Sequence, residues 1–267
     1  MLFWTDVSRY KLTNCYTIKM ENWKENISFI LVEPKEPGNI GASARALKNM
    51  GFHRLEIVGQ KNLITDESRW MACNAIDVLE RAKIFDDFRS AIAEKNLVVG
   101  TTRRIGKRRG LILTLTEGIK RIRNTAMNNR VAILFGREDK GLFNEEVEEC
   151  GFLITIPSDK SSPSLNLAQA VLLVAYELNK DIPNTAIPAF VRHEELSILY
   201  DRIKEALRVL DYIPRGNRDL ERKIMRNLKH LIGRAGLTEW EIKMLHGICS
   251  QVEKKLAATK GVQDNEI

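Results

Sequence analysis

Patterns that bind metals or form disulfide frameworks are absent from this 267-residue sequence. It contains four cysteines and four histidines, and the scattered cysteines form no C-x-x-C pair. Such cysteines are typical of reduced thiols in a cytosolic protein, so a cytoplasmic location is expected. No apolar run reaches the ~18–20 residues that span a bilayer. The N-terminus contains Asp6 and lacks the apolar segment of a signal peptide. The sequence therefore predicts neither a metal nor a membrane partner.

The G-x-G-x-x-G fingerprint of dinucleotide-binding proteins is also missing, because the first loop reads Gly38-Asn-Ile-Gly41 after two prolines. Short apolar runs nevertheless alternate with segments of helical periodicity as far as Leu178. This alternation predicts an α/β domain whose parallel sheet is covered by helices on both faces, with ligands at the carboxyl ends of the strands. The predicted strands are Ile27–Val32, Arg54–Gly59, Lys83–Phe85, Asn96–Thr101, Val131–Phe135 and Phe152–Ile156. The predicted helices are one from about Ile40 capped by Asn39, Glu67–Ala82 with Trp70 and Met71 in the core, Asp87–Glu94, Thr116–Asn128 capped by Thr116, Glu145–Glu149 capped by Asn144, and Asn166–Leu178.

Basic residues exceed acidic ones by 42 to 35, which gives a net charge of +7. The excess is concentrated between Arg103 and Arg130, where the only acid is Glu117. Nine basic residues lie in this segment: Arg103, Arg104, Lys107, Arg108, Arg109, Lys120, Arg121, Arg123 and Arg130. Because no aromatic residues interleave with them, we expect contact with nucleic-acid phosphates rather than base stacking. The alternative is an ordinary solvated face.

The segment 181–191 contains Pro183 and Pro188 and is predicted to be a linker. Residues 192–267 follow a helical pattern, with Thr238 and Glu241 spaced as a capping box. Arg215–Arg234 gathers seven basic residues against two acids. We expect this tethered domain to provide a second RNA contact, at a distance from the first; the alternative is a solvated helix face.

Arg45 is a cation that follows a run of very small residues in a predicted helix. Its neighbours Gly41 and Ala42 are nearly bare, so this face of the helix is predicted to lie against a ligand. A guanidinium there offers a planar fork of donors suited to phosphate. The alternative is a solvated arginine among alanines chosen for helix propensity.

Three segments in this order resemble the motifs of the SPOUT class of RNA methyltransferases. They are GNIGASARALKNMG, VAILFGREDKGL and FLITIPSDKSSPSLNLAQAVLLVAYEL. The resemblance is closest to the TrmJ family of tRNA 2′-O-methyltransferases, including its C-terminal domain near MRNLKHLIGRAGLTEWEIKML. It implies an N-terminal extension at 1–26 with Met20 as an alternative start, a methyltransferase domain at 27–180 that ends in a trefoil knot, and a helical RNA-binding domain at 192–267.

The resemblance also implies S-adenosyl-L-methionine as the cofactor and tRNA as the partner of a cytoplasmic homodimer. The expected product is the 2′-O-methyl ribose of cytidine 32 in the anticodon loop, with uridine as an alternative base. The implied cofactor-binding residues are Thr101, Thr102, Arg103, Gly136, Gly141, Leu142, Ile156, Ser164, Leu165 and Asn166. Among them Leu142 and Leu165 would contact the adenine, and Arg103 departs from the small residue expected there.

By the same resemblance Arg45 is catalytic, assisted by Asn39, which would bond to Arg45 or to the substrate. An arginine is an unlikely base, so we expect it to orient the 2′-oxygen and to stabilise its negative charge. Glu138 either anchors the fold or takes part in proton transfer. The expected RNA-binding residues are Arg104, Lys107, Arg108 and Arg109. The alternative functions are a ribosomal RNA 2′-O-methyltransferase of the SpoU/TrmH branch and a non-catalytic RNA-binding module.

Overall fold

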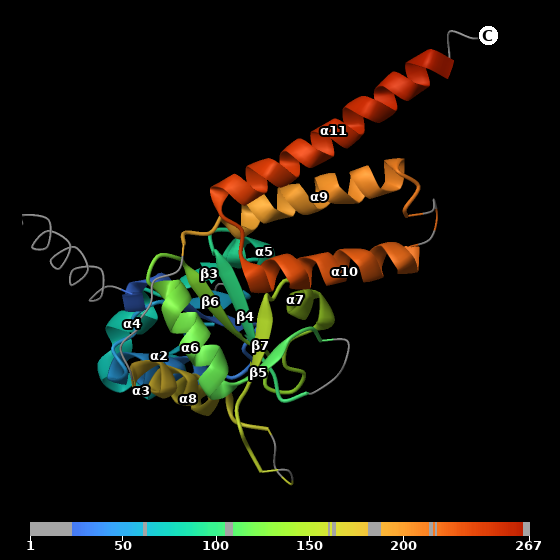
Figure 1. Cartoon of the computed structure of the whole chain (residues 1–267). Helices are drawn as coiled ribbons and strands as arrows, with labels where there is room; N and C mark the ends of the chain where they lie inside the picture. The colour runs from blue at the N-terminus through green and yellow to red at the C-terminus, as the bar shows by residue number, and fades with distance from the viewer. Residues whose placement is uncertain are drawn as a thin grey trace, which may run out of the picture.

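A seven-stranded parallel sheet forms the centre of the molecule, in the order β3-β2-β1-β6-β4-β7-β5 (Figure 1). The computed structural model describes residues 23–60, 63–104, 109–159, 161, 164–180, 188–213, 216 and 218–263. The strands are β1 Ile27–Val32, β2 Leu55–Val58, β3 Lys83–Phe85, β4 Leu97–Thr101, β5 Ile112–Thr114, β6 Val131–Phe135 and β7 Phe152–Thr155. The helices are α2 Pro37–Asn49, α3 Asp66–Ala72, α4 Ile76–Glu80, α5 Phe88–Ile92, α6 Leu115–Ala126, α7 Asn144–Glu148, α8 Leu167–Asn179, α9 His193–Val209, α10 Arg218–Ala235 and α11 Glu239–Gln263, with short 3-10 turns η1 Trp23–Asn26 and η2 Cys73–Ala75.

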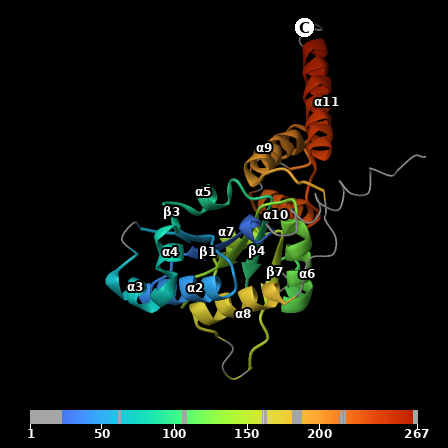
Figure 2. The same ribbon diagram turned by 90° about the vertical axis from the view of Figure 1, so that its left-hand side faces the viewer.

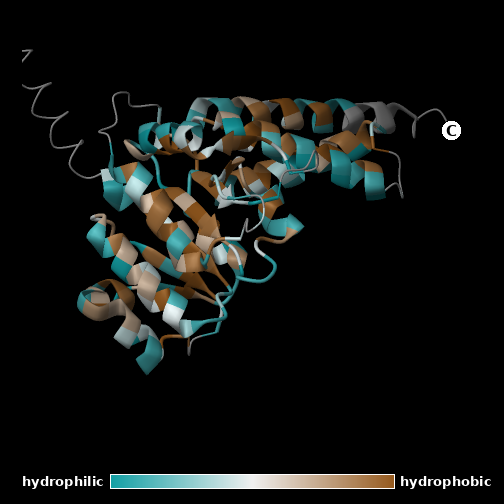
Figure 3. Ribbon diagram, turned by 90° about the horizontal axis from the view of Figure 1, so that it is seen from below, coloured by the Kyte–Doolittle hydropathy of each residue, from teal (hydrophilic) through white to brown (hydrophobic). Residues whose placement is uncertain are grey.

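Two apolar cores cover the two faces of the sheet, as the alternating pattern predicts. The larger joins inward residues of the strands to α2, α4, α6 and α8; within it Phe29 stacks on Phe135 and meets Phe52 edge to face. The smaller core packs the opposite face against α5 and α7. Figure 2 shows α2 and α8 on one side of the sheet and α5 on the other. The inner strands β1, β2, β4, β6 and β7 are buried almost throughout, and the centre of the sheet domain is strongly apolar (Figure 3).

Several predicted helix starts are wrong by one turn or less. Helix α2 begins at Pro37, where proline suits the first turn, so Asn39 lies inside the helix and is no cap. Thr114 caps α6 through a capping box with Glu117, two residues before the predicted Thr116. Asn144 is the first residue of α7. The three-residue strand β5 was not predicted, because it is too short to show a period.

The single helix predicted over Glu67–Ala82 is broken in the structure. Cys73 has a φ of +48°, which ends α3 and turns the chain into η2 and α4. This break leaves Trp70 83% exposed and Met71 45% exposed, so the prediction that both lie in the core is wrong. Two large apolar side chains are therefore exposed side by side in the sequence, a feature found at interaction surfaces.

Helices α9, α10 and α11 form the C-terminal bundle around Leu199, Tyr200 and Ile232. Helix α11 runs beside α9 and extends beyond the sheet domain (Figure 1). The predicted capping box is confirmed, since Glu241 Oε2 accepts from the Thr238 backbone N–H and hydroxyl at 2.7 and 2.8 Å. Helix α9 starts at His193.

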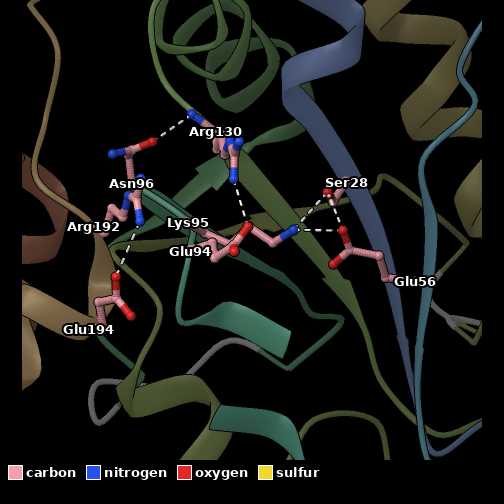
Figure 4. A network of polar contacts seen from close by, with 8 residues as sticks. All are labelled: Ser28, Glu56, Glu94, Lys95, Asn96, Arg130, Arg192 and Glu194. Carbon is pink, nitrogen blue, oxygen red and sulfur yellow. Dashed lines mark hydrogen bonds and ion pairs between the residues drawn. The ribbon is translucent and has the colours of Figure 1, made fainter. Parts of the chain in front are cut away.

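The bundle is docked against the sheet domain, which corrects the expectation that it hangs from a tether. The N–H groups of His193 and Glu194 donate to the carbonyls of Lys95 and Ala93. Beside them, Lys95 is buried and donates to Glu56 Oε1 at 2.6 Å and to the Ser28 hydroxyl at 2.9 Å (Figure 4). This buried network fixes the loop around Lys95, to which the first residues of α9 are hydrogen-bonded.

A second docking contact is charged and involves α7 and α10. Glu149, which follows α7, accepts from Lys229 Nζ at 2.5 Å and pairs with His193 Nε2 at 3.0 Å. Burial raises the pKa of Glu149, but the hydrogen bonds and charges of His193 and Lys229 outweigh it and hold the pKa at about 2. Gly151 and Gly233 complete the contact, because a Cβ on Gly151 would lie 2.3 Å from the Gly233 carbonyl oxygen.

Candidate cofactor pocket and catalytic residues

A pocket opens at the carboxyl ends of β4, β6 and β7, which is where a parallel sheet places its ligands. Nine of the ten predicted cofactor-binding residues line it: Thr101, Thr102, Arg103, Gly136, Gly141, Leu142, Ile156, Ser164 and Leu165. The tenth, Asn166, is not among the lining residues. Its side chain accepts from the N–H groups of Ala168 and Gln169 and so caps α8.

The lining suits a ligand with a flat apolar part and a polar tail. Leu142, Leu165 and Leu167 supply apolar surface, while the backbone at the strand ends supplies N–H and C=O groups. The Thr101 hydroxyl is already committed, because it donates to the Leu134 carbonyl at 2.8 Å. Gly141 has a φ of +66° and no atom within 4 Å of its Cβ position, so the chain leaves open space there. These residues fit the adenosine and methionine parts of S-adenosylmethionine.

Gly136 is required by the chain itself. A Cβ at this position would lie 2.3 Å from the backbone nitrogen of Leu142 and 2.2 Å from the carbonyl carbon of Gly141. The absence of a side chain lets the loop 136–142 fold back on its own strand. A bulky substitution would distort the loop whether or not a ligand binds.

Arg137 holds this loop in place, and sequence reasoning missed it. Its buried guanidinium pairs with Glu146 through two hydrogen bonds of 3.0 and 3.1 Å and with Glu33 at 2.8 Å. It also stacks on Phe143 at 3.8 Å. Both acids together raise the pKa of Arg137 further, although burial opposes them. Nothing in the sequence pairs Arg137 with Glu33, which lies 104 residues earlier.

Glu138 and the two predicted asparagines form a hydrogen-bonded chain beside the pocket. Glu138 Oε1 accepts from Asn39 Nδ2 at 3.0 Å, and Asn39 Oδ1 accepts from Asn166 Nδ2 at 2.8 Å. Backbone N–H groups of Lys35 and Glu36 also donate to Glu138. Burial alone would raise the pKa of Glu138, but these hydrogen bonds lower it overall. An acid held in its ionised form by so many donors favours anchoring over proton transfer.

Arg45 lies on the exposed side of α2, away from this chain. It is six residues after Asn39, or about 9 Å along the helix, and it is not among the residues that line the pocket. Its guanidinium reaches Cys73 Sγ at 3.5 Å. Gly41 does not face a ligand, because a Cβ there would lie 1.9 Å from the Ser68 carbonyl oxygen. The small residues of α2 thus serve partly to pack it against α3.

Comparison with known proteins decides the family. Residues 26–176 match the SpoU rRNA Methylase family, and residues 194–261 match the C-terminal domain of the tRNA methyltransferase TrmJ. The tRNA (cytidine-2′-O-)-methyltransferase TrmJ of Methanocaldococcus jannaschii is 34% identical over 81% of this chain and 96% of its own. The tRNA (cytidine/uridine/adenosine-2′-O-)-methyltransferase TrmJ of Pseudomonas aeruginosa is 30% identical over 86% and 95%. A crystal structure of TrmJ from Z. mobilis superposes with a TM-score of 0.73 at 31% identity and covers 85% of this chain and 98% of that one.

The chain belongs to the TrmJ family of tRNA 2′-O-methyltransferases. The SpoU match covers the sheet domain, and the TrmJ match covers the C-terminal bundle. A SpoU match alone would not account for the bundle. The resemblance of the three motifs and of the C-terminal segment is thereby confirmed.

The basic residues between Arg103 and Arg130 of this TrmJ-family chain have different surroundings in the structure. Arg103, Arg104 and Arg109 lie at the rim of the pocket, and Arg109 donates to the Thr102 hydroxyl at 3.1 Å. Lys107 and Arg108 fall outside the described residues. Arg123 and Arg130 have structural roles instead.

Arg123 is buried, and its side chain donates to the carbonyls of Leu178 and Glu177, which ties α6 to the end of α8. Arg130 pairs with Glu94 at 2.6 Å. Counting charge in the sequence overestimated the surface available to RNA. Within the described part of the chain, no group of three or more His, Cys, Asp or Glu is placed to hold a metal ion. No helix among the same residues has the length and apolar content to cross a bilayer.

Proposed function

We propose that this protein uses S-adenosylmethionine to methylate the ribose 2′-hydroxyl of cytidine 32, or uridine 32, in the anticodon loop of tRNA in the cytoplasm. The observation that carries the proposal is the pocket at the strand ends, which is lined by nine of the ten expected cofactor-binding residues together with Arg104 and Arg109. The TrmJ-type C-terminal bundle favours tRNA over the alternative ribosomal RNA substrate. One relative is named for cytidine alone and another for cytidine, uridine and adenosine. The broader name fits an enzyme that acts on the ribose hydroxyl, which all nucleotides of RNA share.

The reaction needs few protein groups. When bound, S-adenosylmethionine supplies a methyl group on a positively charged sulfur. Thr102, Gly141 and the Ser164–Leu165 turn line the pocket and would hold the cofactor there. Arg45 donates hydrogen bonds to the ribose 2′-oxygen, orients it and stabilises the negative charge that develops on it. Its guanidinium stays protonated, so the hydroxyl proton leaves to solvent or to an RNA phosphate.

The enzyme is further proposed to act as a homodimer in which Arg45 of one protomer completes the pocket of the other. The support is that Arg45 does not line the pocket of its own chain. The surface beside it carries exposed apolar side chains on two helices that pack against α2: Trp70 and Met71 from α3, and Leu172, Leu173 and Tyr176 from α8. On the same helix α8, Val171 and Ala175 are fully buried core, whereas Leu172 is exposed.

Family membership also supports the trefoil knot at the end of the 27–180 domain and the division at the 181–191 linker. The matches end at residue 176 and resume at 194. Both features are proposals that rest on the relatives.

A direct assay tests the reaction. Purified protein is incubated with S-adenosylmethionine and a tRNA transcript, and the methylated nucleotide is located by mass spectrometry. A matched transcript with 2′-deoxycytidine at position 32 should accept no methyl group there. Cofactor binding without transfer to any RNA would favour the non-catalytic module. Methylation at another nucleotide would refute position 32 as the target but not the methyltransferase activity.

Mixing variants tests the shared site. Arg45→Ala and a pocket variant such as Leu165→Trp should each be inactive, whereas their mixture should regain activity in the protomer pairs that contain one intact site. If light scattering shows only a monomer and this monomer is fully active, the dimer is contradicted.

A further inference from the structure

A groove lies between α6 and the end of α10, and none of its lining residues is shared with the cofactor pocket. It has a volume of about 500 Å³ and is lined by both helices and the segment around Phe190. Its charged lining consists of Lys120, Arg121, Arg234 and one acid, Glu117. Glu117 is already committed, because its Oε2 accepts from the Thr114 hydroxyl and N–H to cap α6.

Arg121 is fixed in this groove by the packing of α6 on β7. Gly118, one turn earlier, lets the helix come so close that a Cβ there would lie 2.2 Å from Ile154 Cγ2. The guanidinium of Arg121 consequently lies over the Phe152 ring at 5.1 Å. Unlike Arg130, which pairs with Glu94, it has no salt bridge or hydrogen bond to an acid within the described part of the chain.

Docking of α10 brings a second cation to Arg121. The close contact of Gly233 with Gly151 places the following residue, the exposed Arg234, at the groove. The pKa of Arg121 is lowered, first by burial and then by the charge of Arg234. The fold thus holds two guanidiniums together without an anion between them, at an energetic cost that a bound phosphate would remove.

The groove is connected to the pocket by basic residues. Arg109 at the pocket rim is followed by Gly110, whose Cβ position lies 2.9 Å from the His230 ring. On α10, Arg226, His230 and Arg234 follow each other at intervals of four, so they share one side of the helix. Burial, and after it the charges of Arg226 and Arg234, lower the pKa of His230, as expected for three neighbours on one side of the helix.

We propose that Arg109, Arg226, Arg234, Arg121 and Lys120 form one continuous basic track that binds the tRNA backbone from the pocket rim to the groove between α6 and α10. The inference rests on the proposed function and identifies the surface that carries the substrate. The two basic segments of the sequence are then parts of one binding surface. The docked C-terminal bundle contributes through position, without a flexible tether.

The test is the salt dependence of tRNA binding by the full chain. In the double variant Arg121→Met/Arg234→Met, two phosphate contacts are lost, so the slope of log affinity against log salt should fall by about 1.4–1.8. Methionine keeps an apolar chain over Phe152. The control Arg130→Met/Lys243→Met removes the same charge from residues paired with Glu94 and Glu239, and its slope should match the wild type.

Urea titrations should show that all these proteins are folded without denaturant, and all should bind S-adenosylmethionine with wild-type affinity. If the first variant folds poorly, Lys120→Gln/Arg234→Gln replaces two exposed residues and should give the same loss of slope. A slope equal to wild type in a folded variant overturns the track. Failure of the wild-type protein to bind tRNA at all overturns the proposed function itself.

Discussion

The cofactor pocket and the β5 edge of the sheet both hold arginines against aromatic rings, but only the pocket gives its arginine acids to pair with. Arg137 lies over Phe143 and is matched by Glu33 and Glu146. Arg121 lies over Phe152 and faces another cation, Arg234. Similar side chains in similar packing thus have opposite electrostatic surroundings.

The difference separates scaffold from binding surface. A buried arginine with paired acids has its charge satisfied in the folded protein, and its loss leaves those acids unpaired. An arginine kept near another cation is not satisfied until an anion arrives. Substitutions in the first region should therefore act on stability, whereas those at the second should act on RNA binding.

Arg45 should give the largest effect on activity. Arg45→Ala is expected to lower the methyl-transfer rate by roughly 10²–10⁴, the usual contribution of a positioned charge-stabilising group. Arg45→Lys should also be poor, because the planar fork is lost. Single-turnover rates measure the effect, and Arg81→Ala, at an exposed arginine after α4, is the control. A variant that keeps most of its rate would move catalysis to another residue.

Arg137→Met should destabilise the protein by about 3–5 kcal/mol, because it leaves Glu146 buried without its partner. Urea unfolding measures the change. Arg130→Met breaks a pair whose two side chains are 45% and 60% exposed, so it should cost less than about 1 kcal/mol. Equal losses in the two variants would mean that the pocket arginine is not structural.

Glu149 should make docking of the bundle sensitive to acid. Its pKa is lowered to about 2 in the folded protein from an ordinary value of 4.5, so its contribution is present above pH 4.5 and is lost as the pH falls toward 2. Glu149→Gln should therefore cost about 2–3 kcal/mol at pH 7. The difference from wild type should shrink steadily below pH 4.5 in urea titrations. A constant difference across this range would contradict the assignment.

Glu138→Gln should have the smallest effect of the four. If Glu138 anchors the loop, the variant loses about 1–2 kcal/mol of stability through weaker hydrogen bonds, and its pH–rate profile keeps the wild-type shape. A loss of rate above about 10² at full stability would instead make Glu138 a proton carrier.

The sequence predicted the strands well because strands buried on both faces appear as unbroken apolar runs. The fully buried strands Ile27–Val32 and Val131–Phe135 are confirmed to the residue, and so is the partly exposed edge strand Lys83–Phe85. The pocket could be predicted from the motifs, since its residues follow three strands that end at one edge of the sheet. Its supporting contacts could not be predicted, because Arg137 and Glu33 meet only through the order of β1 and β6 in the sheet.

Charge was harder to interpret than hydrophobicity. Arg121 and Arg123 are two residues apart and look equivalent in the sequence, yet one faces a groove and the other is buried against α8. The exposure of Trp70 depends on a single positive φ at Cys73, which no helical period reveals. Side-chain partners, which decide these cases, come from the tertiary structure.

The central claim is best tested on the tRNA of the source organism. Mass-spectrometric mapping should show a 2′-O-methyl group at nucleotide 32 in tRNA from the parent strain. Deletion of the gene should remove it, the wild-type gene should restore it, and the Arg45→Ala gene should not. Position 32 methylated in full in the deletion strain would contradict the account.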